Sequence, residues 1–130
     1  MEKGSASPLV FVVDDDGRTA RMLAQMLRGD GFRVEVATDG ATAIGRLSRA
    51  PIPAALVTDL HLPHADGLAV ARYARSRRPA LPVFVVTGHP DMVARSADPL
   101  TPPEAELFTK PLDYPELLRR LQVVLGLRAA

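Results

Sequence analysis

Four short segments of the chain are apolar and rich in β-branched residues, a pattern typical of buried strands. LVFVV at 9–13 and PVFVV at 82–86 lack any polar residue, which indicates strands covered on both faces of a parallel sheet. AALVTDL at 54–60 is similar but carries an acid near its end, whereas FRVEVA at 32–37 alternates apolar and charged residues. Alternation predicts one exposed face and a place near the sheet edge. AELFTK at 105–110 predicts a weaker fifth strand.

The segments between these strands show the spacing of amphipathic helices. Asp66 is the expected N-cap of one of them, and Leu118, Leu121 and Leu125 form the apolar face of the last. The predicted helices span 18–31, 39–50, 66–79 and 113–127.

A further helix is expected between the last two strands, but prolines interrupt that segment. A short helix from about 90 to 97 is compatible with a proline in its first turn, whereas 98–103 cannot be helical. The prolines are Pro90, Pro99, Pro102 and Pro103.

Strands that alternate with helices predict right-handed β-α-β units. The expected fold class is therefore α/β, a flavodoxin-like doubly wound five-stranded parallel sheet with strand order 2-1-3-4-5. We expect a single domain over residues 8–128, a flexible tail at 1–7, and a short or irregular fourth helix.

Composition narrows the function. With 47% hydrophobic and 24% charged residues the chain is an ordinary globular one, and its net charge of +1 gives no electrostatic basis for direct nucleic-acid or membrane binding. The absence of cysteine excludes disulfides and thiolate chemistry and fits a cytoplasmic location. The longest apolar runs are too short to cross a bilayer.

The polar residues that end the predicted strands suggest a common site. Asp14 and Asp15 follow the first strand, and Asp59, Thr87 and Lys110 end the third, fourth and fifth. In the expected strand order these ends are neighbours, about 4.8 Å apart from strand to strand. Clustered carboxylates favour a hard divalent cation such as Mg²⁺, and a hydroxyl and an ammonium suit an incoming phosphoryl group.

These motifs, in this order and over essentially the whole chain, closely resemble the receiver domain of bacterial two-component response regulators. The matching residues are Asp14 and Asp15 in VVDDD, Asp59 in LVTDLHLPHADG, Pro63, Asp66 and Gly67, Thr87 in VVTG, and Lys110 and Pro111 in FTKPL.

The resemblance implies a phosphorelay protein that accepts a phosphoryl group on Asp59 from a histidine kinase or a histidine phosphotransfer protein. It implies that Asp15, Asp59 and the backbone carbonyl of His61 hold Mg²⁺, with Asp14 acting through coordinated water. Beyond its own phosphorylation and dephosphorylation, such a protein is not expected to be an enzyme.

The resemblance also assigns roles to the other strand ends. Lys110 would pair with the Asp59 carboxylate and then with its phosphate, and the Lys110–Pro111 bond is expected to be cis. The Thr87 hydroxyl would move onto a phosphate oxygen and pull the loop that follows. Asp16, Asp66 and Gly67 are expected to be helix-cap and turn residues without chemistry.

The sequence departs from the family at the read-out. Receivers usually carry Tyr or Phe three residues before the lysine, where this chain has Leu107, and Phe108 should face the opposite side of the strand. Together with the prolines at 98–103, this predicts that signalling does not use the usual dimer and that the loop at 88–103 changes instead.

Alternatives remain at this stage. The chain could be a receiver-like interaction module that is not phosphorylated. His61 and His64 would need a third ligand for a catalytic zinc site, and His89 lies on a different predicted loop. No effector is recognisable, so the chain is either a single-domain regulator or a receiver from a longer chain; its kinase, target and oligomeric state are not evident.

Overall fold

The structure is a computed structural model that describes residues 7–62, 66–88 and 105–127. Its strands are β1 (Leu9–Val13), β2 (Arg33–Ala37), β3 (Ala55–Asp59), β4 (Val83–Thr87) and β5 (Glu106–Thr109). Its described helices are α1 (Gly17–Gly29), α2 (Gly40–Leu47), α3 (Gly67–Arg77) and α5 (Tyr114–Val124). Each lies within or beside the segment predicted from the apolar pattern.

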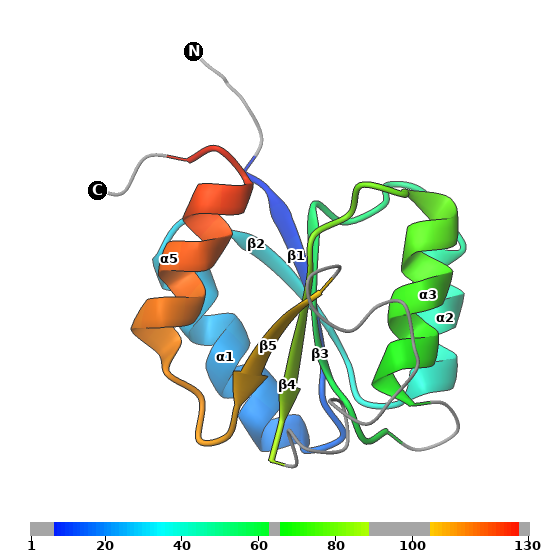
Figure 1. The fold of residues 1–130 in the computed structure, drawn as a ribbon, viewed down its shortest axis with the longest axis horizontal. Coiled ribbons are helices and arrows are strands. Elements are labelled where there is room, and N and C mark those ends of the chain that lie inside the picture. Colours follow the sequence, from blue (N-terminus) through cyan, green and yellow to red (C-terminus); the bar gives the residue numbers. More distant parts are fainter. Residues whose placement is uncertain (1–6, 63–65, 89–104, 128–130) are drawn as a thin grey trace.

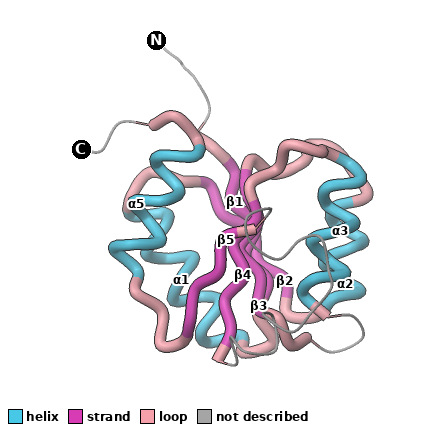
Figure 2. Tube along the Cα trace, viewed as in Figure 1, coloured by secondary structure: helices cyan, strands magenta, loops and turns pink. Residues whose placement is uncertain are grey.

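The strands form one parallel sheet in the order β2-β1-β3-β4-β5, which confirms the predicted topology (Figure 1). Figure 2 shows the sheet as a central layer between two pairs of helices. The register places Val13 beside Thr58, and Asp59 beside Val86. The carboxyl ends of β1, β3 and β4 therefore lie side by side at one end of the sheet, as the sequence predicted.

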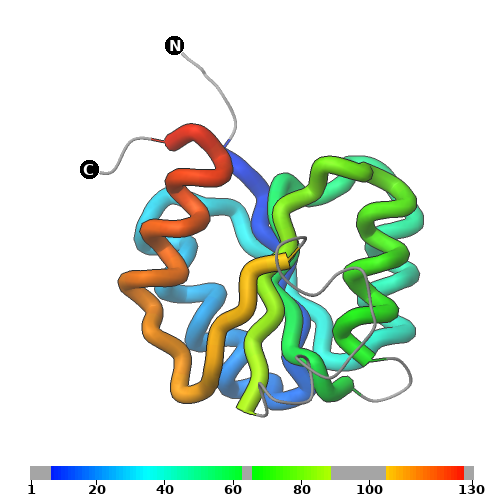
Figure 3. The backbone as a smooth tube through the Cα atoms, viewed as in Figure 1, coloured from blue at the N-terminus to red at the C-terminus, as the bar shows by residue number. Residues whose placement is uncertain are grey.

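Side-chain alternation divides the core into two layers. Val10 and Val12 face α1 and α5, whereas Phe11 and Val13 face α2 and α3. Figure 3 follows the same arrangement along the chain, with the blue α1 and the orange-to-red α5 on one side of the sheet. Because both faces are covered, every residue of β1, β3 and β4 is buried, while β2 alternates and lies at an edge.

Two expectations about side chains can be checked on the last strand and helix. Leu107 packs on the α2/α3 side and Phe108 on the α1/α5 side, 6.1 Å from Phe84 between ring centroids, so the prediction of opposite faces is confirmed. The predicted apolar face of α5 is partly wrong. Leu117 and Leu121 are the fully buried residues, and the predicted Leu118 and Leu125 are only partly buried.

Several expectations lie outside the described residues: most of the tail at 1–7, Pro63, the short helix at about 90–97, the non-helical 98–103, and His64 and His89. In the part of the chain that is described, no helix has the combination of length and apolar character needed to cross a membrane.

Candidate functional site

The three acids after β1 have different surroundings. Asp14 is buried, and one of its carboxylate oxygens accepts a hydrogen bond from the Asp16 backbone N–H at 2.9 Å. Asp15 is exposed. Asp16 is the N-cap of α1, where its carboxylate accepts hydrogen bonds from the backbone N–H groups of Arg18 and Thr19. These bonds, led by that from Thr19, lower the pKa of Asp16. The cap prediction for Asp16 is confirmed, and Asp14 and Asp15 are left for the site.

Asp59 ends β3 next to these acids. Its side chain is buried, and carboxylate oxygens of Asp14, Asp15 and Asp59 lie within 4.8 Å of one another. The His61 backbone N–H donates to Asp59 Oδ1 at 3.3 Å, which holds the exposed His61 beside the carboxylate. The structure thus brings together the three carboxylates that the strand ends predicted.

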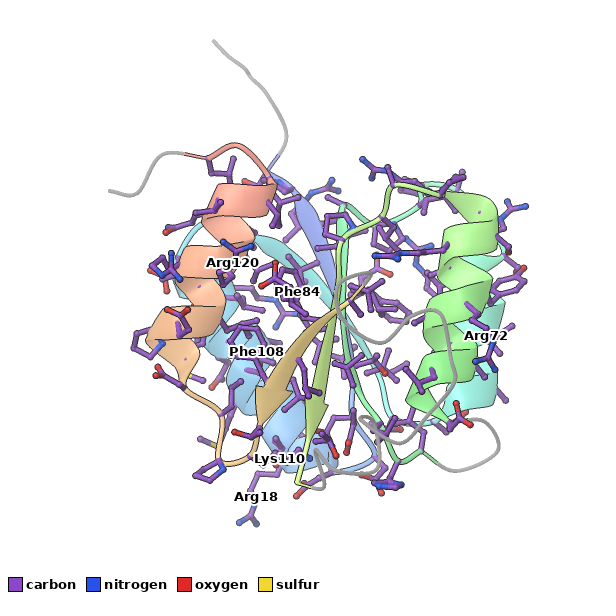
Figure 4. All side chains as sticks on the ribbon, in the orientation of Figure 1. Arg18, Arg72, Phe84, Phe108, Lys110 and Arg120 are labelled. Carbon is purple, nitrogen blue, oxygen red and sulfur yellow. The ribbon has the colours of Figure 1, made fainter. Side chains whose placement is uncertain are left out.

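Lys110 reaches this group from the end of β5. Its Nζ donates to Asp59 Oδ2 at 3.1 Å and to Asp14 Oδ2 at 3.5 Å. Figure 4 shows Lys110 at the edge of the sheet where β4 and β5 end. Burial alone would lower the pKa of Lys110, but the hydrogen bond to Asp59 and the charges of both acids raise it above its ordinary value. The ammonium is therefore firmly protonated and is a fixed positive charge in the site.

Thr87 ends β4 and is fully buried. Its backbone carbonyl accepts a hydrogen bond from the Lys110 N–H at 2.9 Å, and it pairs in register with Thr109. This backbone bond fixes the start of the β5–α5 loop against β4. The Lys110–Pro111 bond is cis, as the resemblance implied.

The backbone of Asp59 is held from the other side by the start of α3. Asp66 is the N-cap of that helix, as predicted, and accepts from the Ala69 N–H at 2.7 Å. Gly67 donates to the Leu60 carbonyl at 2.8 Å, and a Cβ at this position would lie 1.9 Å from the Asp59 carbonyl oxygen. Gly67 is predicted to be a turn or cap residue without chemistry, and the structure adds a positioning role through its close approach to the Asp59 backbone. Glycine is required at this position because of a contact with Asp59, eight residues earlier in the chain.

The electrostatics of the group favour a cation. Burial raises the pKa of Asp14, and the neighbouring charge of Asp59 adds to this effect, while the Asp16 N–H and Lys110 oppose it. Lys110 supplies one positive charge against three carboxylates. Carboxylate oxygens without sulfur or imidazole are the donor set that hard divalent ions prefer. The residues present therefore fit such an ion.

Sequence comparison identifies the family. A model of the response regulator receiver domain matches residues 10–122. The probable transcriptional regulatory protein TcrX of Mycobacterium tuberculosis is 35% identical over 126 residues, covering 96% of this chain and 53% of that protein. The transcriptional regulatory protein PrrA of Mycobacterium leprae is 35% identical over 130 residues, covering 100% of this chain and 55% of that protein. The chain spans about half the length of these relatives.

Solved structures agree on the fold. A response regulator receiver protein from Sinorhizobium medicae superposes with a TM-score of 0.80 at 24% identity, covering 92% of this chain and 95% of that one. The receiver domain of an HD-domain protein from Pseudomonas fluorescens gives a TM-score of 0.81 at 25% identity over the same shares of the two chains. The matched sequence, the sheet order and the acidic edge agree, and the chain belongs to the response regulator receiver family of two-component systems.

Proposed function

We propose that Asp59 is the residue on which this receiver accepts a phosphoryl group, with a phosphohistidine of a kinase or phosphotransfer protein as donor. The observation that carries the proposal is the position of the Asp59 carboxylate, buried at the end of β3 within 3.1 Å of the Lys110 ammonium and beside two further acids. In the reaction a carboxylate oxygen forms a bond to phosphorus as the P–N bond of the phosphohistidine breaks. The leaving imidazole nitrogen keeps the electron pair and is neutral or takes a proton from solvent.

Asp15, Asp59 and the His61 backbone carbonyl would hold Mg²⁺, with Asp14 acting through coordinated water. When bound, the ion neutralises charge on the phosphoryl oxygens. The Lys110 ammonium would also neutralise this charge, because it is held beside Asp59 before the phosphoryl group arrives. Gly67 allows the Asp59 backbone to remain in place. Thr87, at the neighbouring strand end, would donate its hydroxyl to the new phosphate.

The family is one of signalling receivers, not of classical enzymes. We propose that the chemistry of this chain is limited to its own phosphorylation and dephosphorylation. A cytoplasmic location with a histidine kinase or phosphotransfer protein as partner is part of the same proposal. Direct nucleic-acid binding is not part of the proposal, since a net charge of +1 provides no electrostatic basis for it. The downstream partner, whether a target protein or a tethered effector, is not specified by the site.

Intact mass spectrometry tests the acceptor. Incubation with acetyl phosphate and Mg²⁺ should add one phosphoryl group to the parent chain and none to Asp59→Asn, which keeps the side-chain shape but removes the nucleophile. Asp113→Asn is a matched control, because Asp113 is an exposed N-cap and Asn caps equally well. Equal phosphorylation of Asp59→Asn and Asp113→Asn would refute the assignment.

The alternative is a receiver-like module that is not phosphorylated. The two functions differ in divalent-ion binding, which can be measured without a phosphodonor. We expect Mg²⁺ or Mn²⁺ to raise the melting temperature of the parent chain, and Asp15→Asn to abolish most of that rise while barely changing the metal-free protein, since Asp15 is exposed. A parent chain indifferent to both ions would favour the inert module.

A further inference from the structure

A cavity of about 470 Å³ opens beside the acidic site, between α1 and the segment that joins β5 to α5. Its floor is apolar and consists of Val12 and Val57, which pair between β1 and β3, and Val86 of β4, each at most 6% exposed. Leu23 of α1 and Leu112 of the β5–α5 segment line its sides. This volume is in the range of pockets that hold small molecules, and an apolar floor gives enclosed water few hydrogen-bond partners.

The mouth of the cavity is adaptable. Met22 and Met26 line it from α1 with 56% and 39% of their surface exposed, and methionine side chains adjust to occupants of different shape. Tyr114 lines the cavity from the first turn of α5, and its hydroxyl donates to Asp30 Oδ2 at 2.7 Å. One wall is therefore held in place while the other is flexible.

The inner end of the cavity is charged. Asp14, Asp16 and Asp59 line it together with Lys110. The Asp16 carboxylate caps α1, so among the described residues the carboxylates of Asp14 and Asp59 stand beside the Lys110 ammonium. An anionic head group would meet a net negative charge there, while a cationic head group would be attracted to it. An occupant that satisfies both ends has an apolar body and a positively charged head.

We propose that this cavity is a binding site for small amphipathic amines, with the ammonium beside Asp14 and Asp59 and the apolar tail against Met22, Met26 and Leu112 above the valine floor. Such a ligand places its positive charge where the carboxylates would otherwise hold a divalent ion. Its further consequence, which rests on the proposed function, is that an occupied cavity suppresses phosphoryl acceptance.

The binding test uses the whole chain without metal or phosphodonor, so it is independent of phosphorylation. Octylammonium, octanol and octanoate share one tail and differ in the charge of the head. Isothermal titration should give octylammonium at least about tenfold tighter binding than octanol, with octanoate weakest. Amide shifts in a ¹⁵N spectrum should include Ala20, Leu23 and Leu112. Equal binding of the three probes, no binding, or shifts centred on the exposed Val123 and Leu127 would overturn the proposal.

Two pairs of variants locate the tail and the head. Met26→Lys puts a positive charge at the mouth and should weaken octylammonium binding about tenfold, whereas Val124→Lys, similarly exposed on α5 (36% against 39%) and outside the cavity, should not. Asp59→Asn should weaken octylammonium but not octanol. Asp39→Asn should change neither, because Asp39 caps α2 on the other face of the sheet and does not line the cavity. An Asp39 effect equal to that of Asp59, or indifference to Met26→Lys, would contradict the assignment.

Discussion

At residue 67 a single methyl group decides whether the site can form. The Cβ of any other residue would lie 1.9 Å from the Asp59 carbonyl oxygen and 2.8 Å from its carbonyl carbon. Both atoms are backbone and cannot move without shifting the end of β3. We therefore expect Gly67→Ala to destabilise the protein by about 3 kcal/mol or more and to reduce phosphorylation of the fraction that folds. Denaturant unfolding and intact mass measure the two effects.

Gly45→Ala is the matched control for this substitution. Gly45 lies inside α2, and nothing stands within 4 Å of its added Cβ. The change should stabilise the protein by about 0.5–1 kcal/mol, as is usual for Gly→Ala in a helix interior. A Gly67→Ala protein as stable as Gly45→Ala would show that the close approach to Asp59 is not present in solution.

The buried charge of Asp14 gives a pH-dependent prediction. Burial raises the pKa of Asp14, so the folded protein binds this proton more tightly than the unfolded chain does. The resulting stability is fully present below the unfolded pKa of about 4 and is lost as pH rises through the higher folded pKa. In metal-free buffer at pH 7, Asp14→Asn should therefore raise the melting temperature relative to the parent chain.

The same comparison at pH 3 should show a smaller gain, because Asp14 is then protonated in both states. Asp16→Asn is the control, since the pKa of Asp16 is lowered by its cap hydrogen bonds and its charge is not a cost to folding. Equal gains for Asp14→Asn and Asp16→Asn at pH 7 would contradict the assigned difference between the two acids.

Residue types at strand ends were sufficient to predict the acids and the lysine of the site, because neighbouring parallel strands bring their carboxyl ends together whatever the details of packing. The role of Gly67 could not be predicted in this way. It depends on how closely the first turn of α3 approaches the backbone of β3, and that distance is set by tertiary packing and not by the local pattern.

At the scale of elements, polar contacts of Tyr114 and Arg120 attach α5 to α1 and to β5. Glu106 of β5 accepts two hydrogen bonds from the Arg120 guanidinium, at 2.8 and 2.6 Å, and Figure 4 shows Arg120 on the side of α5 that faces the sheet. Near the start of the helix the Tyr114 hydroxyl donates to Asp30 at the end of α1. These two contacts complement the burial of Leu117 and Leu121 on the same helix.

We expect Tyr114→Phe to cost about 1 kcal/mol at pH 7, the usual value of one hydrogen bond. Tyr73→Phe is the control, because the described part of the chain gives the Tyr73 hydroxyl no hydrogen-bond partner. Burial and the bond to Asp30 raise the pKa of Tyr114, so this stabilisation is present below the unfolded tyrosine pKa of about 10 and is lost at higher pH. Chemical denaturation at pH 7 and pH 11 measures the free energy of unfolding of both variants. Equal losses for Tyr114→Phe and Tyr73→Phe at both pH values would refute the contact.

The elements themselves were largely predictable. Continuous apolar runs indicated strands buried on both faces, and Asp and Pro marked the starts of α3 and α5. The face of α5 was less well predicted, because Leu117, Leu118, Leu121 and Leu125 allow two overlapping apolar stripes. The angle at which the helix meets the sheet decides between them, and periodicity alone does not give that angle.

At the scale of the whole molecule, the site lies at the carboxyl ends of the strands, while β1 begins and α5 ends at the opposite end of the sheet (Figure 1). We call the surface formed by β5 and α5 the β5–α5 face. Position 107 of β5 carries Leu107 and no aromatic residue, and this leucine packs partly buried against the α2/α3 core. The sequence shows a leucine where the family usually has Tyr or Phe, and the structure shows what this leucine contacts.

The charges on the β5–α5 face are paired within the chain. Glu106 is bound by Arg120, and Glu116 is bound by Arg119 at 2.8 and 2.6 Å. A symmetric dimer through this face would have to break these pairs in order to form new ones between subunits, with little net gain for exposed charges. Together with Leu107 in place of the aromatic residue usual in the family, this argues against a dimer that depends on rearranged ion pairs on this face.

We therefore expect the protein to keep its association state on activation. Beryllofluoride with Mg²⁺ mimics the phosphate, and we expect it to leave the sedimentation coefficient unchanged at protein concentrations up to about 100 μM. A dimer whose Kd is above about 100 μM would be held together by less than about 5.5 kcal/mol. Asp59→Asn is the control, because it removes the carboxylate that binds the mimic. A dimer that forms only in the parent chain with beryllofluoride, and that Arg120→Ala abolishes, would show that the ion pairs on this face do rearrange and that a leucine at position 107 is sufficient for the switch.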